Sequence, residues 1–343
     1  MVSKDKLNAL YEYNKPINWN VSCFGNDSLM YVISVYIDFL KKLKIKNPIK
    51  TIHGSYASRY NGGRTAFFIR DNQYIYDKIR EFNDLGIGVK LTFSHPYFTK
   101  EWFEEKELNE YLEVLSERKD LDNGIICSID EFANYIHKNY PTLSVTSSYV
   151  KVASETRLGK TDTIDYYNKL FDIYDIIVFN IFRAFDDEFL DQIKYKDRIE
   201  FIANASCNIN CPIAKKHYQI NYDFNQRVKW LHDHNIYSED PKLKIIQEEL
   251  LSINRNCIKR KNQNNINNFN HRQLNKDEIN HLLSLGINRF KIEGRDYDID
   301  TFKYYLFKYI FNNDSILDQL TLIPKDFNLL NDWKAHKKFE NGL

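Results

Sequence analysis

Two of the five cysteines of the chain, Cys207 and Cys211, are separated by three residues in the segment Asn204–Tyr218. The segment follows the apolar run Ile199–Ala203, which is predicted to be a buried strand. Two thiols just past the end of a strand can face one pocket, and thiolates suit zinc and iron–sulfur clusters. Free cysteine is also a small buried hydrophobic residue. The pair alone therefore admits both interpretations.

A third cysteine favours the metal interpretation. Cys257 lies in the polar segment Asn254–Arg260, where a core role is not expected. Together with the pair, it is predicted to bind a metal or an iron–sulfur cluster. Cys23, near the carboxyl end of the first predicted strand, is the preferred fourth ligand, ahead of Cys127 within the fourth strand. A cluster with one open iron, or with one non-cysteine ligand, is equally admissible.

Polar residues follow other predicted strands. His53 and His95 are candidate acid–base groups, because imidazole titrates near neutral pH. Glu293 and Arg295 follow the eighth strand and are predicted to be catalytic, although they could instead form an ion pair that closes the barrel. The predicted substrate-binding residues are Arg59, Asn61, Arg64, Asn180, Arg183 and His217.

The loop Gly54–Arg64 resembles an anion-binding loop, because it combines glycines with two arginines. A glycine-rich tight turn explains the same composition equally well. The loop fits neither the P-loop nor the dinucleotide fingerprint. The chain also lacks the HExxH, GxSxG and CxxxCxxC signatures of zinc proteases, serine hydrolases and radical-SAM enzymes.

Short apolar runs alternate with helical patterns along most of the chain. Strands are predicted at Ile17–Phe24, Pro48–His53, Val89–Phe93, Gly124–Ser128, Leu143–Ser147, Ile173–Asn180, Ile199–Ala203 and Arg289–Ile292. Helices are predicted at Ser28–Leu43, Asn72–Leu85, Glu101–Leu115, Ile129–Ile136, Thr163–Phe171, Asp186–Ile193 and Asp277–Leu285. Eight strand–helix units favour a TIM-like (β/α)8 barrel, with a doubly wound open sheet as the alternative. In either fold the ligand site lies at the carboxyl ends of the strands.

The predicted barrel covers residues 1–300, with an insertion at about 219–275. The Asn-rich stretch Asn254–Asn275 is its least regular part and is predicted to be a loop. Residues 301–343 contain aromatic-rich helical patterns and are predicted to form a C-terminal helical extension packed on the barrel.

The 48 basic and 47 acidic residues give a net charge of +1, so an extended nucleic-acid-binding face is not expected. No apolar run approaches the roughly 20 residues that span a bilayer. The first residues lack a signal-peptide core. A cytoplasmic protein with reduced thiols and no membrane contact is expected.

Three segments carry a family resemblance. Phe290–Arg295 reads Phe-Lys-Ile-Glu-Gly-Arg and follows the helical pattern Ile279–Gly286. Asn204–Tyr218 contains Asn…Cys-x-x-x-Cys-Pro…His-Tyr, and His53-Gly-Ser precedes Asn61-Gly-Gly-Arg64. In this order the segments resemble the collagenase-like peptidases, unclassified peptidase family 32, over most of residues 52–295.

The resemblance implies a TIM-like barrel with a cysteine-bound 4Fe–4S cluster, and Cys207, Cys211 and Cys257 match cluster positions. Several relatives are oxygen-independent hydroxylation enzymes or their accessory proteins, which act on tRNA, rRNA or the ubiquinone ring. The chain is short and lacks the appended C-terminal domain of longer members, as expected for a divergent branch.

Three functions follow from these expectations. The first is an iron–sulfur enzyme that modifies a small molecule or a nucleic-acid base, with zinc as the alternative metal. The second is a metal-dependent or cysteine-assisted hydrolase. The third is a non-catalytic iron–sulfur scaffold that serves a protein partner. The barrel fold by itself does not decide among them.

Overall fold

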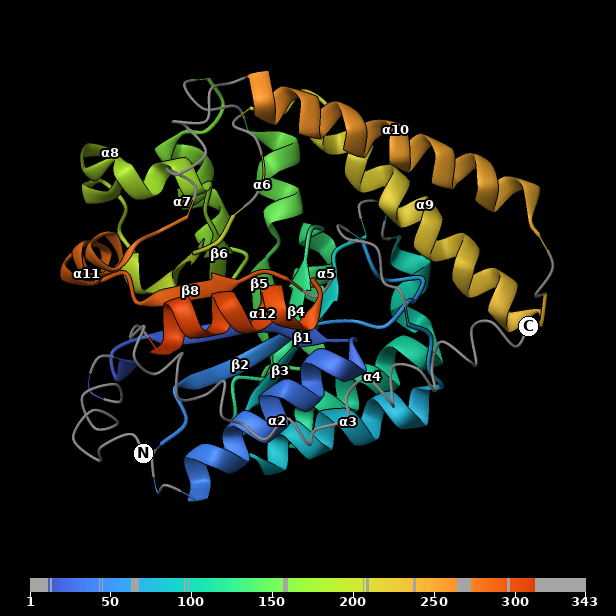
Figure 1. Ribbon diagram of the computed structural model, residues 1–343, viewed down its shortest axis with the longest axis horizontal. Coiled ribbons are helices and arrows are strands. Elements are labelled where there is room, and N and C mark those ends of the chain that lie inside the picture. The colour runs from blue at the N-terminus through green and yellow to red at the C-terminus, as the bar shows by residue number, and fades with distance from the viewer. Residues whose placement is uncertain are drawn as a thin grey trace.

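The computed structural model describes residues 12, 14–42, 44, 46–62, 68–95, 97, 99–156, 160–205, 207, 210–236, 239–263, 273–294 and 297–311, without the side chains of 39, 257–263 and 311. Figure 1 shows a central barrel of strands surrounded by helices, with a pair of long helices along one side.

The eight strands form a closed barrel in which β8 pairs with β1. Every pairing is parallel. The strands are β1 (Asn18–Phe24), β2 (Ile49–Gly54), β3 (Gly88–Phe93), β4 (Gly124–Cys127), β5 (Ser144–Ser147), β6 (Ile176–Val178), β7 (Ile199–Ile202) and β8 (Arg289–Ile292). The predicted TIM-like (β/α)8 barrel is confirmed, and the open sheet is wrong because its edge strands would not pair.

The helices predicted between the strands are present, whereas α6, α9 and α10 were not predicted. They are α2 (Asp27–Lys42), α3 (Asn72–Asp84), α4 (Lys106–Ser116), α5 (Asp130–Asn139), α6 (Tyr149–Glu155), α7 (Ile164–Phe171), α8 (Asp187–Asp191), α9 (Ala214–Asp233), α10 (Pro241–Gln263), α11 (Lys276–Ser284) and α12 (Ile299–Leu306). Short 3₁₀ turns form η1 (Lys100–Glu104), η2 (Ile181–Phe185) and η3 (Lys196–Arg198), and η6 (Phe307–Phe311) is a π-helical turn. The chain turns out of α3 at Gly86, whose φ of +79° suits glycine.

Side chains alternate between the two faces of each strand. Trp19 of β1 faces the helices, where its ring centroid lies 5.7 Å from that of Phe290 and 6.0 Å from that of Tyr309. Its indole nitrogen donates to Asn14 Oδ1 at 2.7 Å. Large apolar side chains fill this outer layer and join barrel and helices in one core. The opposite faces of the strands enclose the barrel interior, here called the lumen.

The described part of the predicted C-terminal extension is helical and packs on the barrel. Tyr309 donates from its hydroxyl to the carbonyl of Ala203 at 2.8 Å, and Asn14 donates to the carbonyl of Ile310 at 2.6 Å. Residues 312–343 lie outside the described residues.

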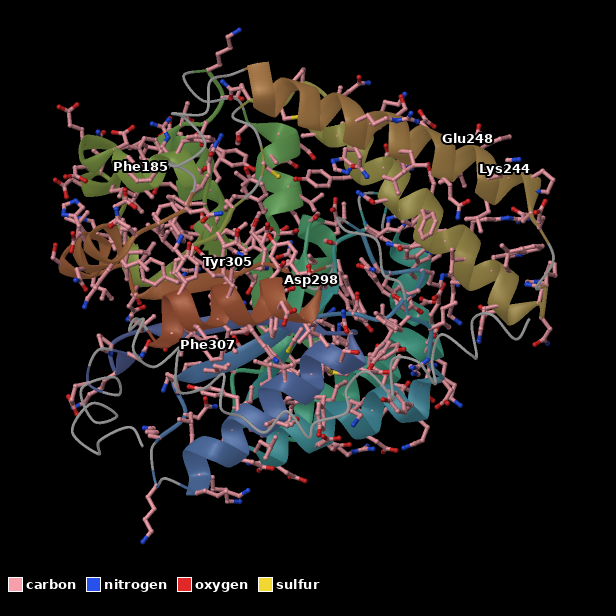
Figure 2. All side chains as sticks on the ribbon, viewed as in Figure 1. Phe185, Lys244, Glu248, Asp298, Tyr305 and Phe307 are labelled. Atoms are coloured by element: carbon pink, nitrogen blue, oxygen red, sulfur yellow. The ribbon has the colours of Figure 1, made fainter. Side chains whose placement is uncertain are left out.

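The segment between β7 and α11 contains the antiparallel helices α9 and α10, which lie side by side in Figure 1. Lys216 of α9 pairs with Glu249 of α10 at 2.7 Å. Exposed Lys244 and Glu248 lie on the solvent side of α10 (Figure 2). The predicted loop 254–275 is wrong for residues 254–263, because these continue α10, whereas 264–272 lie outside the described residues. No helix among the described residues is long and apolar enough to cross a membrane.

An ion pair closes the amino-terminal end of the lumen. Lys90 of β3, only 2% exposed, places its ammonium 3.1 Å from Asp122 Oδ1. Asp122 also accepts from the Ser144 hydroxyl at 2.7 Å and lies 3.7 Å from the Arg289 guanidinium. Burial raises the pKa of the Asp122 carboxyl, but Lys90, Ser144 and Arg289 together hold it below its usual value.

This lowered pKa predicts an acid-dependent stability. The contribution of Asp122 is complete above its unfolded-state pKa of about 3.9, and it is lost as the pH falls through the lower folded-state value. We expect the free energy of unfolding, measured in urea from about pH 6 to about pH 2, to fall less steeply in Asp122→Asn than in wild type. Asp38→Asn, at an exposed position on α2, is the control. Equal slopes in Asp122→Asn and wild type would contradict the assignment.

Candidate functional site

The carboxyl ends of β7 and β8 are tied together by one side chain. Asn204 donates from its amide to the carbonyl of Glu293 at 2.8 Å, and the Glu293 N–H donates to Asn204 Oδ1 at 2.8 Å. Both bonds fix the backbone of Glu293 at the mouth of the barrel. The asparagine of the Asn204–Tyr218 segment thus positions a residue of the Phe290–Arg295 segment.

Cys207 and Cys211 lie in the loop between this asparagine and α9, and both are half-buried. Asn210 within the loop has a φ of +48°, a left-handed conformation that asparagine tolerates. The Cys207 sulfur lies 4.0 Å from the Tyr218 hydroxyl, and Cys211 packs against a small apolar cluster that includes Tyr218. The loop leads directly into the amino terminus of α9.

Two phenols accompany the thiols, and Tyr218 is buried whereas Tyr149 is half-buried. Burial raises the pKa of the Tyr149 hydroxyl well above its usual value, and nearby Cys207, Glu293, Asp162 and Cys211 raise it further. The pKa of Tyr218 is raised in the same way by burial, Cys207, Tyr149 and Glu293. All of these influences disfavour additional negative charge. A cation bound by the thiols would offset it.

The helical hairpin returns Cys257 toward the same loop. The Lys216–Glu249 ion pair sets the antiparallel register of α9 and α10. Eight residues beyond Glu249, about 12 Å along the helix axis, α10 reaches residue 257. This level lies past Ala214, where α9 begins and the chain arrives from Cys211. Residue 257 therefore lies beyond the end of the hairpin at which α9 begins.

The other two cysteines have different surroundings. Cys23 and Cys127 are both fully buried in the hydrophobic core. Burial raises the pKa of the Cys23 thiol, and it raises that of Cys127 to about 12. A raised pKa disfavours the thiolate that binds metal. Their placement therefore does not favour either as the fourth ligand.

The described residues contain no group of three or more His, Cys, Asp and Glu side chains arranged to hold a metal ion. The predicted ligand set also includes Cys257, whose side chain is not among those described. The half-buried pair Cys207 and Cys211 supplies two thiols of the kind that bind zinc or iron–sulfur clusters.

His95 is held in an aromatic environment. Its ring centroid lies 4.6 Å from that of Trp102 and 3.6 Å from that of Tyr222 of α9. Burial is the main cause that lowers its pKa to about 3, and the nearby positive charge of Arg59 lowers it further. Nδ1 accepts from the Tyr97 N–H at 2.7 Å, so the neutral ring carries its proton on Nε2. His95 is thus a neutral hydrogen-bond donor at physiological pH, which does not favour the predicted proton-transfer role.

Arg59 lies over the Trp102 ring, with its guanidinium carbon 4.8 Å from the ring centroid, and pairs with Glu105 at 3.0 Å. Asn61 is fully buried, and both atoms of its amide lack hydrogen-bond partners in the described structure. His217 is half-buried on α9. Of the remaining predicted site residues, Arg64 and Arg295 lie outside the described residues.

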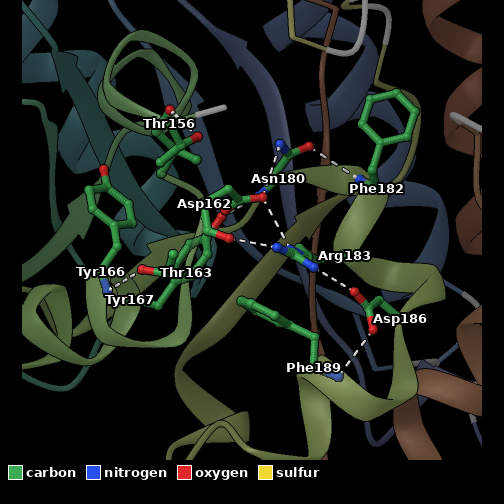
Figure 3. Close-up of polar contacts among 11 residues, drawn as sticks. Thr156, Asp162, Thr163, Tyr166, Tyr167, Asn180, Phe182, Arg183, Asp186 and Phe189 are labelled. Carbon is green, nitrogen blue, oxygen red and sulfur yellow. Dashed lines mark hydrogen bonds and ion pairs between the residues drawn. The ribbon is translucent and has the colours of Figure 1, made fainter. Parts of the chain in front are cut away.

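Asn180 and Arg183, predicted to bind substrate, belong to an internal ion network (Figure 3). The Arg183 Nε lies 3.1 Å from Asp162 Oδ2, Nη2 donates to the Asp162 carbonyl at 2.6 Å, and Nη1 donates to Asp186 at 2.5 Å. The guanidinium carbon lies 3.7 Å from the Phe189 ring centroid. Asn180 approaches the same Asp162 oxygen at 3.5 Å. Arg183 therefore holds the loop that contains Asp162 and is not placed to bind an anionic ligand.

His53 lies in the lumen. Its Nδ1 is 2.8 Å from Asn20 Oδ1, and Asn20 donates to Glu200 Oε1 at 3.0 Å. His53, Asn20 and Glu200 are 4%, 2% and 3% exposed, so the contact is shielded from solvent. Asn20 and Glu200 were not predicted from the sequence, because both lie within strands and not at strand ends. A carboxylate in the middle of the apolar pattern Ile-Glu-Phe-Ile was the available signal.

No protein-family model matches the chain, and no curated protein matches it. Among solved structures, the U32 peptidase Mk0906 is similar at a TM-score of 0.42 and 13% identity, over 67% of this chain and 84% of that one. The HpcH/HpaI aldolase from Desulfitobacterium hafniense DCB-2 is similar at a TM-score of 0.30 and 10% identity, over 95% and 98% of the two chains. Likenesses this distant do not decide family or activity, so both rest on the chain's own residues.

Proposed function

We propose that this chain is an enzyme with a thiolate-bound iron–sulfur centre at the barrel mouth, and that it modifies a small molecule or a nucleic-acid base. The observation that supports the proposal is the proximity of Cys207, Cys211 and Glu293 to the phenols of Tyr149 and Tyr218. Cys257, carried back by α10, is the proposed third ligand. When bound, such a cluster supplies redox chemistry at the mouth.

The chain's own residues have separate roles in this proposal. The Tyr218 hydroxyl, next to the Cys207 sulfur, donates to the thiolate and tunes it. Asn204 fixes the backbone of Glu293, whose carboxylate holds or releases a proton beside the cluster. The Tyr149 phenol stays protonated because its pKa is raised, so it is a hydrogen-bond donor to substrate.

Metal analysis of cysteine variants tests the proposal. We expect the anaerobically purified protein to contain about four irons and four sulfides per chain. Cys207→Ala, Cys211→Ala and Cys257→Ala should each lose the cluster. Cys127→Ala is the matched control and should keep it, because that thiol is buried in the core. Cys23→Ala should also keep it.

Two other results would change the proposal. One zinc per chain, lost in the same three variants, would replace the cluster by the zinc alternative. A protein that contains neither iron nor zinc after reconstitution would contradict the metal centre. The hydrolase would then be the favoured function.

The scaffold alternative also has an observation in its favour. The α9–α10 hairpin exposes Trp230 at 41%, Ile245 at 65% and Leu251 at 56%. Exposed apolar side chains are common at protein interfaces. A stable complex with a second protein, together with a cluster that exchanges no electrons with small-molecule substrates, would support a scaffold rather than an enzyme.

A further inference from the structure

Helix α9 joins two opposite sides of the barrel mouth. Near its start, the Tyr218 hydroxyl lies 4.0 Å from the sulfur of Cys207, which follows β7. One turn later, Tyr222 contacts His95, which follows β3, with 3.6 Å between the ring centroids. In the closed order of the strands, three strands lie between β3 and β7 in either direction. The helix therefore runs over the end of the barrel at which the cysteine pair lies.

The hairpin of α9 and α10 is anchored at one side of the mouth. Its base packs on α6, where Val150 forms a small apolar cluster with Ala214 and Tyr218. Helix α10 packs against α9 and is largely exposed on its other faces. Figure 1 shows α9 starting beside α6 and extending away from it together with α10. The hairpin is thus an arm that is held at α6 and reaches the opposite rim through Tyr222.

Aromatic rings form the seat on which Tyr222 rests. The His95 ring centroid lies 4.6 Å from that of Trp102, and the two planes are 79° apart, an edge-to-face contact. The guanidinium of Arg59 lies over the Trp102 ring, and the His95 backbone N–H donates to the carbonyl of Tyr60 at 3.2 Å. The seat is therefore built from the loops that follow β2 and β3. Edge-to-face aromatic contacts are weak enough to form and break reversibly.

The buried side of α9 carries amides among its apolar residues. Asn221 and Asn225 are only 5% and 0% exposed. Two further buried amide atoms, Gln219 Oε1 and Gln226 Nε2, have no hydrogen-bond partner in the part of the chain that the structure describes. Burying such atoms without partners costs free energy, which contact with water would restore. A permanently packed helix is normally apolar on its buried face, so this composition favours a contact that opens and closes.

We propose that the α9–α10 hairpin is a lid over the barrel mouth, and that the contact of Tyr222 with the His95–Trp102 pair is its latch. In the closed state α9 lies across the mouth and shields it from solvent. When Tyr222 leaves its seat, the hairpin lifts about its anchor on α6, and a substrate can enter. The lid rests on the proposed function for the identity of what it admits, and its contacts stand independently of that function.

The motion can be measured without a substrate, by ¹⁹F relaxation dispersion of the protein labelled with 5-fluorotryptophan. The chain has four tryptophans, Trp19, Trp102, Trp230 and Trp333, and each resonance is assigned by its loss in a Trp→Phe variant. Lids open on microsecond to millisecond timescales. We expect Trp102, next to the latch, to show exchange on this timescale. Trp19, fully buried in the core, is the internal control and should show none. A Trp102 resonance without exchange would overturn the lid.

Tyr222→Ala is the decisive variant, and Tyr222→Phe is its matched control. Phenylalanine keeps the ring that contacts His95, so the exchange of Trp102 should remain as in wild type. Alanine removes the ring, and the population of the open state should rise by about two- to tenfold, the effect of losing one aromatic pair. The same response in both variants, or no response in either, would overturn the latch. If Tyr222→Ala does not fold, the wild-type exchange still decides.

A soluble gadolinium chelate tests whether α9 covers the mouth. It should broaden the Trp102 resonance more in Tyr222→Ala than in Tyr222→Phe, and leave that of Trp19 unchanged in both. Equal broadening of Trp102 in the two variants would contradict the cover. These measurements do not use iron or zinc. A rigid Trp102 would therefore leave the proposed metal centre intact, and a protein without metal would leave the lid intact.

Discussion

Arg183→Ala is expected to lower the free energy of unfolding by about 3–5 kcal/mol, the usual cost of removing one partner of a buried ion pair. Arg183 is 12% exposed and Asp162 is fully buried, so the variant leaves a carboxylate without its counter-ion. It also removes the guanidinium from the face of Phe189. Urea unfolding at neutral pH measures the change.

Arg80→Ala is the matched control for this prediction. Arg80 pairs with Glu117 at 2.7 Å, but the two side chains are 43% and 45% exposed. Its replacement should cost at most about 1 kcal/mol, because solvent screens exposed pairs.

The double variant Arg183→Ala with Asp162→Asn separates charge from packing. It should regain part of the lost stability, because the uncompensated carboxylate is gone. A cost for Arg183→Ala no larger than that for Arg80→Ala would show that the network is not a structural anchor. Arg183 would then return as a candidate for substrate binding.

Gly54→Ala is expected to cost about 2–5 kcal/mol, the sum of backbone strain and overpacking. Gly54 ends β2 directly after His53 and has a φ of +149°, which side-chain-bearing residues rarely adopt. A Cβ at this position would lie 1.8 Å from the Phe24 carbonyl oxygen, inside the backbone of β1. Backbone cannot move aside as a flexible side chain does, so the β1–β2 pairing beside His53 would be distorted.

Gly86→Ala isolates the contribution of the backbone conformation. Gly86 also has a positive φ, of +79°, but an added Cβ would meet no atom within 4 Å. It should therefore cost only about 1–2 kcal/mol. Urea unfolding of the two variants compares them directly, and equal costs would contradict the proposed close approach at Gly54.

Local sequence pattern was sufficient to predict the barrel. Apolar runs such as 199–203 and 289–292 have the length of buried strands, and helical periodicity separates them. Glycines such as Gly86 mark where helices end. Eight repeats of this unit then admit few topologies, because parallel strands need helical connections. The same pattern places Cys207 and Cys211 after the seventh strand, and therefore at the mouth.

The surroundings of individual side chains could not be predicted from local sequence pattern. His95 and Arg183 have the residue types of a catalytic base and an anion-binding group. Burial lowers the pKa of His95, however, and the Arg183 guanidinium is already paired with Asp162 and Asp186. The predicted loop at 254–263 was wrong because these residues continue α10. Extending a helix that has already formed costs less than starting one, so it overrides the weak local preference of asparagine against helix.

What the sequence by itself determined is the order of strands and helices and the end of the barrel at which the cysteine pair lies. The tertiary structure alone decided which side chains meet. Asn20 and Glu200 are 180 residues apart, and they touch because closure of the barrel joins β1 to β8 and so brings β7 near β1. Periodicity reports which face of a strand is buried, but not which distant strand lies across the lumen.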